Sequence, residues 1–382
     1  MADITPLLRA EIDLDAIAHN VRELRRITRP ESRLMAVVKA NAYGHGVAEV
    51  ARQALKSGAD CLGVARLDEG IQLRKAGFAD ASILIFGPTP LSRAGKIMAF
   101  DLTQTVCSYE SACALSEMAV SHGRKIRVHF KTDTGMGRLG TMLGTASDHR
   151  QQVTEIASLA SLQGLELEGI FTHFAASDSA DKSFTKKQFG IFTRFLSQLR
   201  DAGLNIPVRH AANSAAIIDH PETHLDMVRA GISLYGLYPS DEVDKSRLRL
   251  QPAMSLKSGI VHLKQVPAGF KISYGMTYET KTPTTIATVA VGYADGFSRL
   301  LSSQGHMLVR GQKAPIVGRV CMDLTMLDVG HIPDVCPEDE VIIIGTQGDA
   351  SVTADEIATI LGTINYEIVS SITARVPRIY SI

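Results

Sequence analysis

Short apolar runs alternate with longer segments of helical period along the chain up to about residue 240. The runs are rich in Val, Ile and Leu, which is typical of strands in a parallel sheet that is covered on both faces. Eight such runs are present, and eight parallel strands close a (β/α)8 barrel. We therefore predict an α/β fold with a TIM-type barrel over residues 1–240. The predicted strands are Leu34–Val38, Cys61–Ala65, Ser82–Phe86, Thr103–Cys107, Ile126–Lys131, Leu167–Phe171, Val208–Ala211 and Met227–Ile232.

Several segments between these strands have the pattern of amphipathic helices. Gly203 follows the longest of them and marks a helix end, because glycine readily adopts the left-handed conformation found there. The predicted helices are Ala48–Ser57, Asp68–Ala76, Ser108–Ser121 and Thr185–Ala202.

After residue 240 the pattern changes to strands that are separated by Gly and Pro turns. A length of 382 residues also exceeds what one hydrophobic core usually serves. We predict a mostly β C-terminal domain over residues 241–382, with Asp241–Gln251 as the connector and one helix over Thr353–Leu361. Leu8–Leu14 has a strand pattern too and could pair with either domain. The predicted strands of the second domain are Lys257–Val266, Thr285–Tyr293, Met307–Val309, Val317–Asp328 and Glu340–Ile344.

The charge balance argues against one broad class of function. Lys plus Arg and Asp plus Glu number 40 each, so no bulk positive field attracts nucleic acid or an anionic membrane. The chain has neither the start of a secretory signal nor an apolar segment long enough to span a bilayer. The five cysteines include no C-x-x-C pair, which argues against a disulfide framework and a thiolate metal site. We expect a cytoplasmic protein with a small-molecule ligand and no metal, nucleic acid or membrane partner.

Polar side chains gather where the predicted barrel strands end, which is where barrel enzymes carry their active sites. Lys39 follows the first strand directly after the apolar Met-Ala-Val-Val, where an ammonium group is partly desolvated and easier to deprotonate. A neutral amine can form a Schiff base, although a lysine at a strand end can also simply extend to solvent. The other polar residues at these ends are Arg138, His173, Asn213, Ser214 and Arg229.

Asn213 and Ser214 begin a predicted helix after the seventh strand, where backbone N–H groups attract an anion such as phosphate. Gly231 and Ile232 follow the eighth strand and could complete a phosphate site. An ordinary helix N-cap at Asn213 is the alternative. His173 and Arg229 could each be structural, but their occurrence with a lysine at one barrel end favours function.

The sequence resembles the alanine racemase family, and the resemblance extends over nearly the whole chain. Its most specific part is Ala36-Val-Val-Lys-Ala-Asn-Ala-Tyr-Gly-His-Gly46, which is similar to the cofactor-lysine motif of that family. The other matching segments are His129-Phe-Lys-Thr-Asp-Thr-Gly-Met-Gly-Arg138, Thr172-His-Phe-Ala175, Ala212-Asn-Ser-Ala215, Val228-Arg-Ala-Gly-Ile232, Ser273-Tyr-Gly275, Gly292-Tyr-Ala-Asp-Gly296, Cys321-Met-Asp323 and Asn365-Tyr-Glu367.

The resemblance implies a pyridoxal 5'-phosphate cofactor joined to Lys39 as a Schiff base. His173 would pack beside the pyridine ring, and Arg229 would face its nitrogen. A guanidinium stays protonated, so Arg229 would donate a hydrogen bond without protonating the ring. The residues implied around the phosphate are Tyr43, Asn213, Ser214, Gly231, Ile232 and Tyr366.

Racemisation needs acid–base groups on both faces of the reacting carbon, because one group returning its own proton mostly regenerates the starting enantiomer. The resemblance assigns Lys39 to the D-enantiomer and Tyr274, from the partner subunit, to the L-enantiomer. A phenol has a pKa near 10, so cations must stabilise its anion, and a relay through His173 to Arg229 would do this. Tyr278 is the local alternative to Tyr274.

The resemblance also implies residues that contact the substrate. Arg138 and the backbone near Met322 would bind its carboxylate, since an arginine fork matches that group. Lys131 resembles a lysine that is carbamylated in some relatives, and an ion pair with Asp133 is the alternative. Leu324 departs from the family, whose members often have a polar residue there. The residues implied at the entrance are Tyr293, Cys321 and Asp323.

Because Tyr274 and Met322 lie in the β-rich domain while Lys39 lies in the barrel, the resemblance implies a homodimer with shared active sites. The expected reaction interconverts L-alanine and D-alanine, either to supply D-alanine for peptidoglycan or to catabolise alanine. A broader serine and alanine racemase remains open. A non-catalytic cofactor-binding barrel normally lacks the β-rich domain, and a decarboxylase of the same fold type typically places a carboxylate where Arg229 lies.

Overall fold

The computed structural model describes residues 6–144 and 149–381, so residues 1–5 and 382 at the outer ends of the two predicted domains lie outside it. The described chain forms two compact units. One unit comprises Ala16–Ala42 and Val47–Pro252. The other comprises the chain up to Asp15, the short segment Tyr43–Gly46 and the chain from Ala253 onward.

The first unit is a closed barrel whose described residues form eight parallel strands, with neighbours in the sheet also neighbours in the chain. β2 pairs with β10 and β5 pairs with β6, so the sheet has no gap. The short β7 (Thr141–Met142) extends β6. This is the fold class predicted from the sequence, and all eight predicted strands are present. They are β2 (Arg33–Val37), β3 (Cys61–Val64), β4 (Ile83–Ile85), β5 (Thr103–Val106), β6 (Ile126–Asp133), β8 (Leu165–Phe171), β9 (Val208–His210) and β10 (Met227–Ala230).

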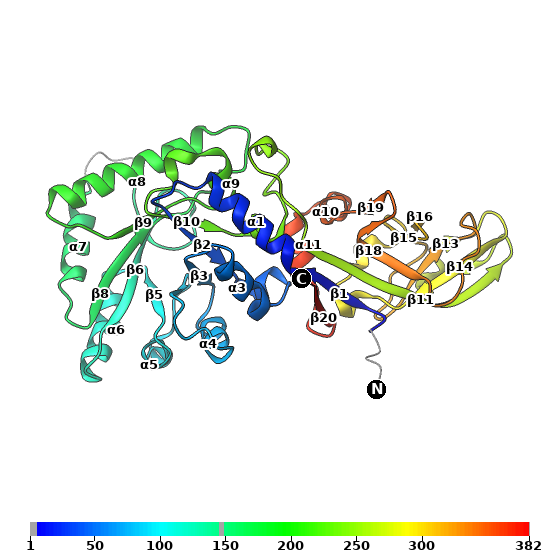
Figure 1. Ribbon diagram of the computed structural model, residues 1–382, viewed down its shortest axis with the longest axis horizontal. Helices are drawn as coiled ribbons and strands as arrows, with labels where there is room; N and C mark the ends of the chain where they lie inside the picture. Colours follow the sequence, from blue (N-terminus) through cyan, green and yellow to red (C-terminus); the bar gives the residue numbers. More distant parts are fainter. Residues whose placement is uncertain (1–5, 145–148, 382) are drawn as a thin grey trace. The chain divides into compact units, whose positions relative to one another are not determined.

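Helices lie around the outside of these strands (Figure 1). α3 illustrates why they form, since Val47, Val50, Ala51 and Ala54 are buried at the spacing of one helix face. The four predicted helices are present, and α1, α5 and α7 are additions that the sequence analysis did not name. The helices of this unit are α1 (Leu14–Ile27), α3 (Val47–Lys56), α4 (Leu67–Lys75), α5 (Gly95–Ala99), α6 (Tyr109–Ser121), α7 (Arg150–Ala160), α8 (Ser183–Asp201) and α9 (Ser214–Asp219).

The second unit is built around the long strand β11 (Met254–Val266), which pairs with β1, β14 and β18. β1 (Arg9–Asp13) lies antiparallel to β11 and parallel to β20 (Arg378–Ser381). The strand predicted at Leu8–Leu14 therefore pairs with the β-rich unit. The other strands and α-helices of this unit are β12 (Lys271–Ile272), β13 (Tyr278–Glu279), β14 (Thr284–Val289), β15 (His306–Val309), β16 (Gln312–Pro315), β17 (Thr325–Asp328), β18 (Glu340–Gln347), β19 (Ala350–Val352), α10 (Ala354–Leu361) and α11 (Asn365–Ser370).

Two predicted strands of this unit are too long. The strand predicted at Val317–Asp328 is limited to β17, because Gly318 has a left-handed φ of +73° that breaks the extended chain. The strand predicted at Thr285–Tyr293 ends at Val289, and Tyr293 begins a short 3-10 helix. The apolar content of a short run does not show where the strand ends. The short helix α11 was not predicted either.

Across the described residues, no helix is both long and apolar enough to cross a membrane.

Gly236→Ala should destabilise the barrel more than Gly203→Ala. Both glycines have left-handed φ angles, +83° and +82°, and alanine pays roughly 1–2 kcal/mol there. A Cβ at Gly236 would lie 1.8 Å from the carbonyl oxygen of Gln251, whereas one at Gly203 meets no atom within 4 Å. Comparison of the urea midpoints of the two variants and the wild type checks this, and equal losses would contradict it.

Candidate active site

The predicted polar residues of the barrel lie at one end of it. Lys39 follows β2, Lys131 lies near the end of β6, His173 follows β8 and Arg229 lies in β10. All strands are parallel, so their carboxyl ends meet at the same rim. The predicted Asn213 and Ser214 follow β9, and Arg138 lies in the loop after β6.

Arg229 is buried and held by protein acceptors. Its Nη2 donates to the carbonyl oxygens of Ala211 at 2.8 Å and Thr172 at 2.9 Å, and it lies 3.1 Å from Nδ1 of His173. Burial, together with the charge of Arg138, lowers the pKa of Arg229 to about 9. That pKa is still above neutrality, so Arg229 remains a cation at pH 7.

A chain of buried histidines continues from Arg229 into the barrel. Arg229 Nη1 donates to Nδ1 of His210 at 2.8 Å, so the proton of His210 must be on Nε2. Nε2 of His210 then donates to Nδ1 of His129 at 2.9 Å, and Nε2 of His129 faces Glu168 at 3.5 Å. Burial lowers the pKa of both histidines, which keeps them neutral. This series of contacts therefore orients Arg229 through two neutral imidazole rings, the second of which faces the carboxylate of Glu168.

Cations dominate the electrostatics of this rim. Burial and Arg138 lower the pKa of Lys39, with Glu69 acting in the opposite direction. Burial, then Arg229 and Arg138, lower the pKa of Lys131 to about 8. His173 has its pKa lowered well below 6.5 by burial and then by the same cations. The rim thus holds an excess of positive charge, which favours an anionic ligand and a neutral amine.

Lys131 lies 4.4 Å from the ring centre of Phe171. The predicted alternative, an ion pair between Lys131 and Asp133, is not found within the described ranges. Asp133 instead accepts backbone N–H groups of the following loop, from Gly135 and Met136 at 2.8 Å and from Arg138 at 3.1 Å. The carboxylate of Asp133 therefore shapes the loop that carries Arg138.

The backbone after Lys39 is strained. Residues Ala40, Asn41 and Ala42 have φ between 52° and 54°, a left-handed turn that costs roughly 1–2 kcal/mol per residue. The carboxylate of Glu69 accepts the N–H of Ala40 at 2.6 Å and that of Ala65 at 2.7 Å. Glu69 thereby joins the residue after Lys39 to the end of β3.

The loops after β9 and β10 are joined by one hydroxyl. Ser214 Oγ accepts the N–H of Gly231 at 2.8 Å and that of Ser233 at 3.4 Å. Asn213 is also an N-cap, because its Oδ1 accepts the N–H of Ala216 at 3.0 Å. The hydroxyl of Ser233 is buried and has no hydrogen-bond partner among the described residues. Ile232, predicted as part of a strand, begins a 3-10 helix.

The β-rich unit carries a second group of predicted residues. Tyr274 is 71% exposed and follows Ser273, whose φ of +65° and ψ of −177° are normally adopted only by glycine. The Ser273 hydroxyl donates to the carbonyl oxygen of Arg319 at 2.6 Å, which holds this turn. Tyr278, the predicted alternative, packs against the core residues around Ile272, and burial raises its pKa.

Tyr293, Cys321 and Met322 lie together because two backbone segments approach closely. The N–H of Tyr293 donates to Cys321 O at 3.0 Å, and a Cβ at Gly292 would lie 2.2 Å from Met322 O. Glycine is therefore required at position 292. The hydroxyl of Ser273 and the thiol of Cys321 are 3.5 Å apart, so Tyr274 and these residues belong to one surface.

Asp323 and Leu324 are exposed beside that surface, and Asp323 pairs with Arg375 at 2.8 Å. The predicted Tyr43 and Tyr366 also belong to the β-rich unit, with ring centres 6.1 Å apart. Burial raises the pKa of Tyr43.

Sequence reasoning missed the groups that support the reactive residues. His210 and Glu168 were not singled out, and His129 was noted only as the start of a motif. Glu69 was missed as well, because it lies in the first turn of a helix, where acidic residues are common. His129 and Lys131 lie two residues apart on β6, and this alternation was the one available sign that both point into the barrel.

Comparisons with known proteins match both units of the chain to one family. The model of the alanine racemase N-terminal domain matches residues 12–239, and that of the C-terminal domain matches residues 253–380. An alanine racemase of Desulfosudis oleivorans is 56% identical over 97% of this chain and 96% of its own length. One of Methanococcus maripaludis is 50% identical over 97% of this chain and 98% of its own length.

Solved structures give the same result. An alanine racemase of Clostridium difficile has a TM-score of 0.93 and 44% identity, covering 99% of this chain and 97% of that one. One of Bacillus anthracis, solved with bound L-Ala-P, has a TM-score of 0.92 and 40% identity over 100% of this chain and 96% of that one.

The matches to both domains of one racemase family, over nearly the whole chain, identify a racemase, which is an isomerase. The chain belongs to the alanine racemase family. This family uses pyridoxal phosphate.

Lys131→Met should flatten the pH dependence of the free energy of unfolding between pH 8 and 10.5. The folded-state pKa of Lys131 is about 8 against an ordinary 10.5, so in this window the unfolded chain binds a proton that the folded chain does not, and stability rises with pH. The destabilisation that the buried ammonium group of Lys131 causes is complete below pH 8 and is lost by pH 10.5. Urea titrations of cofactor-free protein in CO2-free buffer should show a difference on the order of 1 to 3 kcal/mol. Lys125→Met, at an exposed position, is the control, and an unchanged slope in Lys131→Met would contradict the assignment.

Proposed function

We propose that this chain interconverts L-alanine and D-alanine with pyridoxal 5'-phosphate held on Lys39. The observation that carries the proposal is the placement of Lys39, Lys131, Arg138 and Arg229 at one rim of the barrel with His173. Nη2 of Arg229 lies 3.1 Å from Nδ1 of His173, and all four cations lower the pKa of that histidine. Such a rim suits a cofactor with a phosphate and a phenolic oxygen, and a substrate with a carboxylate. The racemase family supplies the reaction class.

The residues present fit this cofactor. Asn213, Ser214, Gly231 and Ile232 form two joined loops. The buried hydroxyl of Ser233 has no hydrogen-bond partner within the described part of the chain, and a phosphate can supply one. Tyr43 and Tyr366 would complete the phosphate site. His173 would pack beside the ring and Arg229 would donate to its nitrogen. When bound, pyridoxal phosphate withdraws electrons from the substrate Cα, and less strongly when its ring nitrogen only accepts a hydrogen bond.

Arg229 is well suited to that limited role. The two hydrogens of its Nη2 go to carbonyl groups and one hydrogen of its Nη1 goes to His210, so among the described contacts the second Nη1 hydrogen and the Nε hydrogen are left to donate. The guanidinium stays protonated at neutral pH. A weaker electron sink disfavours a long-lived carbanion, which would otherwise enter side reactions. A racemase benefits because the proton returns quickly to carbon.

Two bases exchange that proton. Lys39 is the first, and its lowered pKa makes the neutral amine available. Tyr274 of the partner subunit is the second, and its exposure leaves the phenol free to enter another site. His173 accepts from Arg229 on Nδ1, so its proton is on Nε2. That N–H can donate to the phenolate oxygen of Tyr274 and stabilise it.

Arg138 and the backbone of Met322 would bind the substrate carboxylate, with Tyr293, Cys321 and Asp323 at the entrance. A carbamate on Lys131 would orient Arg138. The pKa of about 8 leaves part of Lys131 as a neutral amine at neutral pH, which can react with CO2, and two nearby arginines stabilise the anion formed. In the Lys131→Met comparison, added bicarbonate should then stabilise the wild type below pH 8 and leave the variant unchanged.

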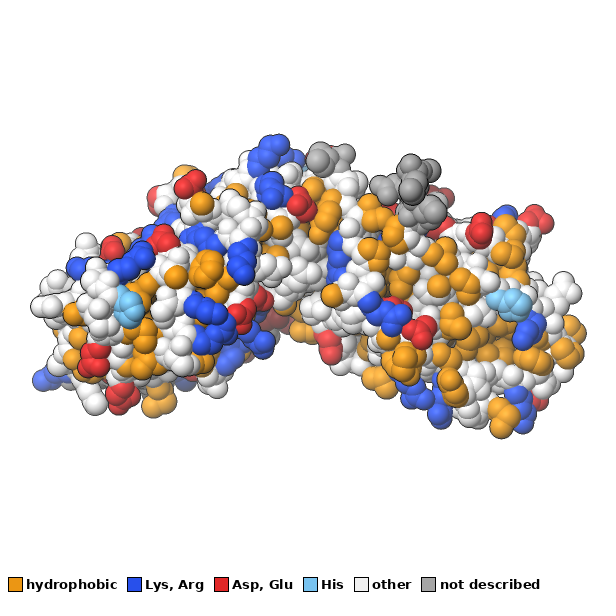
Figure 2. Space-filling model, turned by 90° about the horizontal axis from the view of Figure 1, so that it is seen from below, with side chains coloured by type: hydrophobic (Ala, Val, Ile, Leu, Met, Phe, Trp, Pro, Cys, Tyr) orange, Lys and Arg blue, Asp and Glu red, His pale blue; other side chains and the backbone are white. Residues whose placement is uncertain are grey.

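A homodimer with shared sites would bring Tyr274 to Lys39 of the other chain. The β-rich unit has unusual apolar exposure, because it contributes eleven of the fifteen large hydrophobic residues that are exposed among the described residues. Hydrophobic side chains gather on it in the right half of Figure 2. Exposed apolar surface of this kind is typical of interfaces. The eleven residues are Leu7, Val261, Phe270, Tyr274, Met276, Tyr293, Leu300, Met322, Leu324, Ile364 and Tyr380.

Substrate breadth depends on whether a polar group reads a serine hydroxyl, since one hydroxyl otherwise discriminates weakly. Leu324 adds no such group. The cytoplasmic location and the choice between supplying D-alanine and degrading alanine remain predictions.

Lys39→Ala should lose both the yellow absorbance of bound cofactor and turnover. Tyr274→Phe should keep the absorbance and lose at least about 100-fold in turnover, the lower range for a missing acid–base group, with the larger loss starting from L-alanine. Absorbance spectra and enantiomer exchange in both directions measure this. Tyr278→Phe is the control and should retain activity. Full activity of Tyr274→Phe in both directions would disprove the second base, while loss of colour only in Lys39→Ala would still support the cofactor site.

Lys39→Ala and Tyr274→Phe should complement each other when co-expressed. If every site takes Lys39 from one subunit and Tyr274 from the other, about half of randomly formed dimers are mixed, and each mixed dimer has one intact site of two. The mixture should therefore recover about a quarter of wild-type activity, measured as turnover per subunit. Recovery no greater than that of either variant alone would mean that the sites are not shared.

A further inference from the structure

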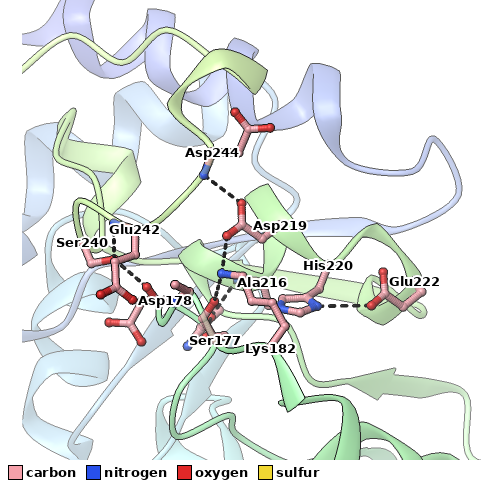
Figure 3. Close-up of polar contacts among 12 residues, drawn as sticks. Ser177, Asp178, Lys182, Ala216, Asp219, His220, Glu222, Ser240, Glu242 and Asp244 are labelled. Carbon is pink, nitrogen blue, oxygen red and sulfur yellow. Dashed lines mark hydrogen bonds and ion pairs between the residues drawn. The ribbon is translucent and has the colours of Figure 1, made fainter. Parts of the chain in front are cut away.

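A polar network joins three segments of the barrel unit behind the loops assigned to the phosphate. These segments are the loop after β8, helix α9 and the connector near residues 240–244 (Figure 3). In the connector, the Ser240 hydroxyl donates to the carbonyl oxygen of Asp178 at 2.6 Å, and Glu242 accepts the N–H of Ala180. The loop after β8 is therefore tied to the connector at two points.

Ser177, in the same loop, contacts Asn213 directly. Ser177 is 1% exposed, and its hydroxyl donates to Asn213 Oδ1 at 2.8 Å. The same oxygen accepts the N–H of Ala216 at 3.0 Å. Two donors on Oδ1 fix the orientation of the amide, so the Nδ2 hydrogens of Asn213 must point to the opposite side.

Lys182 holds the position of Ser177. Its Nζ donates to the carbonyl oxygen of Ser177 at 3.2 Å and pairs with Asp219 Oδ2 at 2.6 Å. The Asp219 side chain is 6% exposed, and its other oxygen accepts the N–H of Asp244 at 3.1 Å. Asp219 ends α9, the helix that Asn213 caps. The ion pair joins the C-terminal end of α9 to the loop of Ser177, and the hydrogen bond from Ser177 to Asn213 joins the N-terminal end. Lys182 also compensates a nearly buried carboxylate.

We propose that Ser177 and Lys182 are positioning residues for the phosphate end of the cofactor. They keep the Asn213–Ser214 turn in the geometry that binds phosphate, acting through Asn213 and α9 without touching the ligand. The inference rests on the proposed function and adds residues that the reaction itself does not require. Its specific consequence is that the network matters for a phosphorylated ligand and not for the same ligand without its phosphate.

The test compares pyridoxal phosphate with pyridoxal. Wild type, Ser177→Ala and Lys182→Met are stripped of cofactor with hydroxylamine, and each is titrated with either compound by absorbance. We expect each variant to bind pyridoxal phosphate about tenfold more weakly, the size of one lost hydrogen-bonded contact, and pyridoxal within about twofold of wild type. Lys182→Arg should restore binding. Lys187→Met, an exposed lysine on α8, is the matched control and should behave as wild type.

An equal loss for both compounds would overturn the proposal, because it would show general damage to the barrel. Unchanged binding in Ser177→Ala would overturn it as well. If Lys182→Met does not fold, the Ser177→Ala result decides alone. Failure of the proposed function has a different signature, namely that wild type itself forms no yellow complex with either compound.

Discussion

The pairing of the first and last barrel strands is the constraint on which the site depends. β2 and β10 come from distant parts of the chain, and their register sets Arg229 opposite Met35 and Ala230 opposite Ala36. Lys39 is the second residue after the end of β2. Closure therefore puts the amine of Lys39 and the guanidinium of Arg229 on neighbouring strands at one rim, and a shift of the register would separate them.

Closure also concentrates like charges, and the interior of the barrel is built to tolerate them. Arg229 has carbonyl and histidine acceptors, and the histidines lead to the carboxylate of Glu168. Burial and mutual repulsion lower the pKa values of Lys39 and Lys131. Without a bound anion, the barrel is thus less stable than one with an uncharged interior would be. An anionic ligand relieves the repulsion among the buried cations. The attraction for an anionic ligand and the lowered pKa values of the two lysines therefore have the same physical origin.

Most helices and strands were predictable from local patterns, but the residues at which they begin and end were not. Buried runs such as Cys61–Val64 and amphipathic segments such as Val47–Lys56 carry their own signal. Val317–Asp328 was predicted as one strand because apolar content alone does not reveal the left-handed Gly318 inside it. The proposed site residues came from strand ends and motifs, which indicate side chains able to contact a ligand. Supporting groups such as Ser177 have no motif, because their role depends on which loop folds over them.

The sequence by itself determined the fold class, the residues able to perform the chemistry and the presence of two different units, because periodicity and residue type are local properties. Tertiary structure decided which unit β1 joins, which histidine tautomers orient Arg229 and how Asn213 is held. It also distinguished the exposed Tyr274 from Tyr278, which packs against the core. Those outcomes depend on contacts between segments far apart in the chain, and the free energy of such contacts is set by three-dimensional packing and burial, which no single segment encodes.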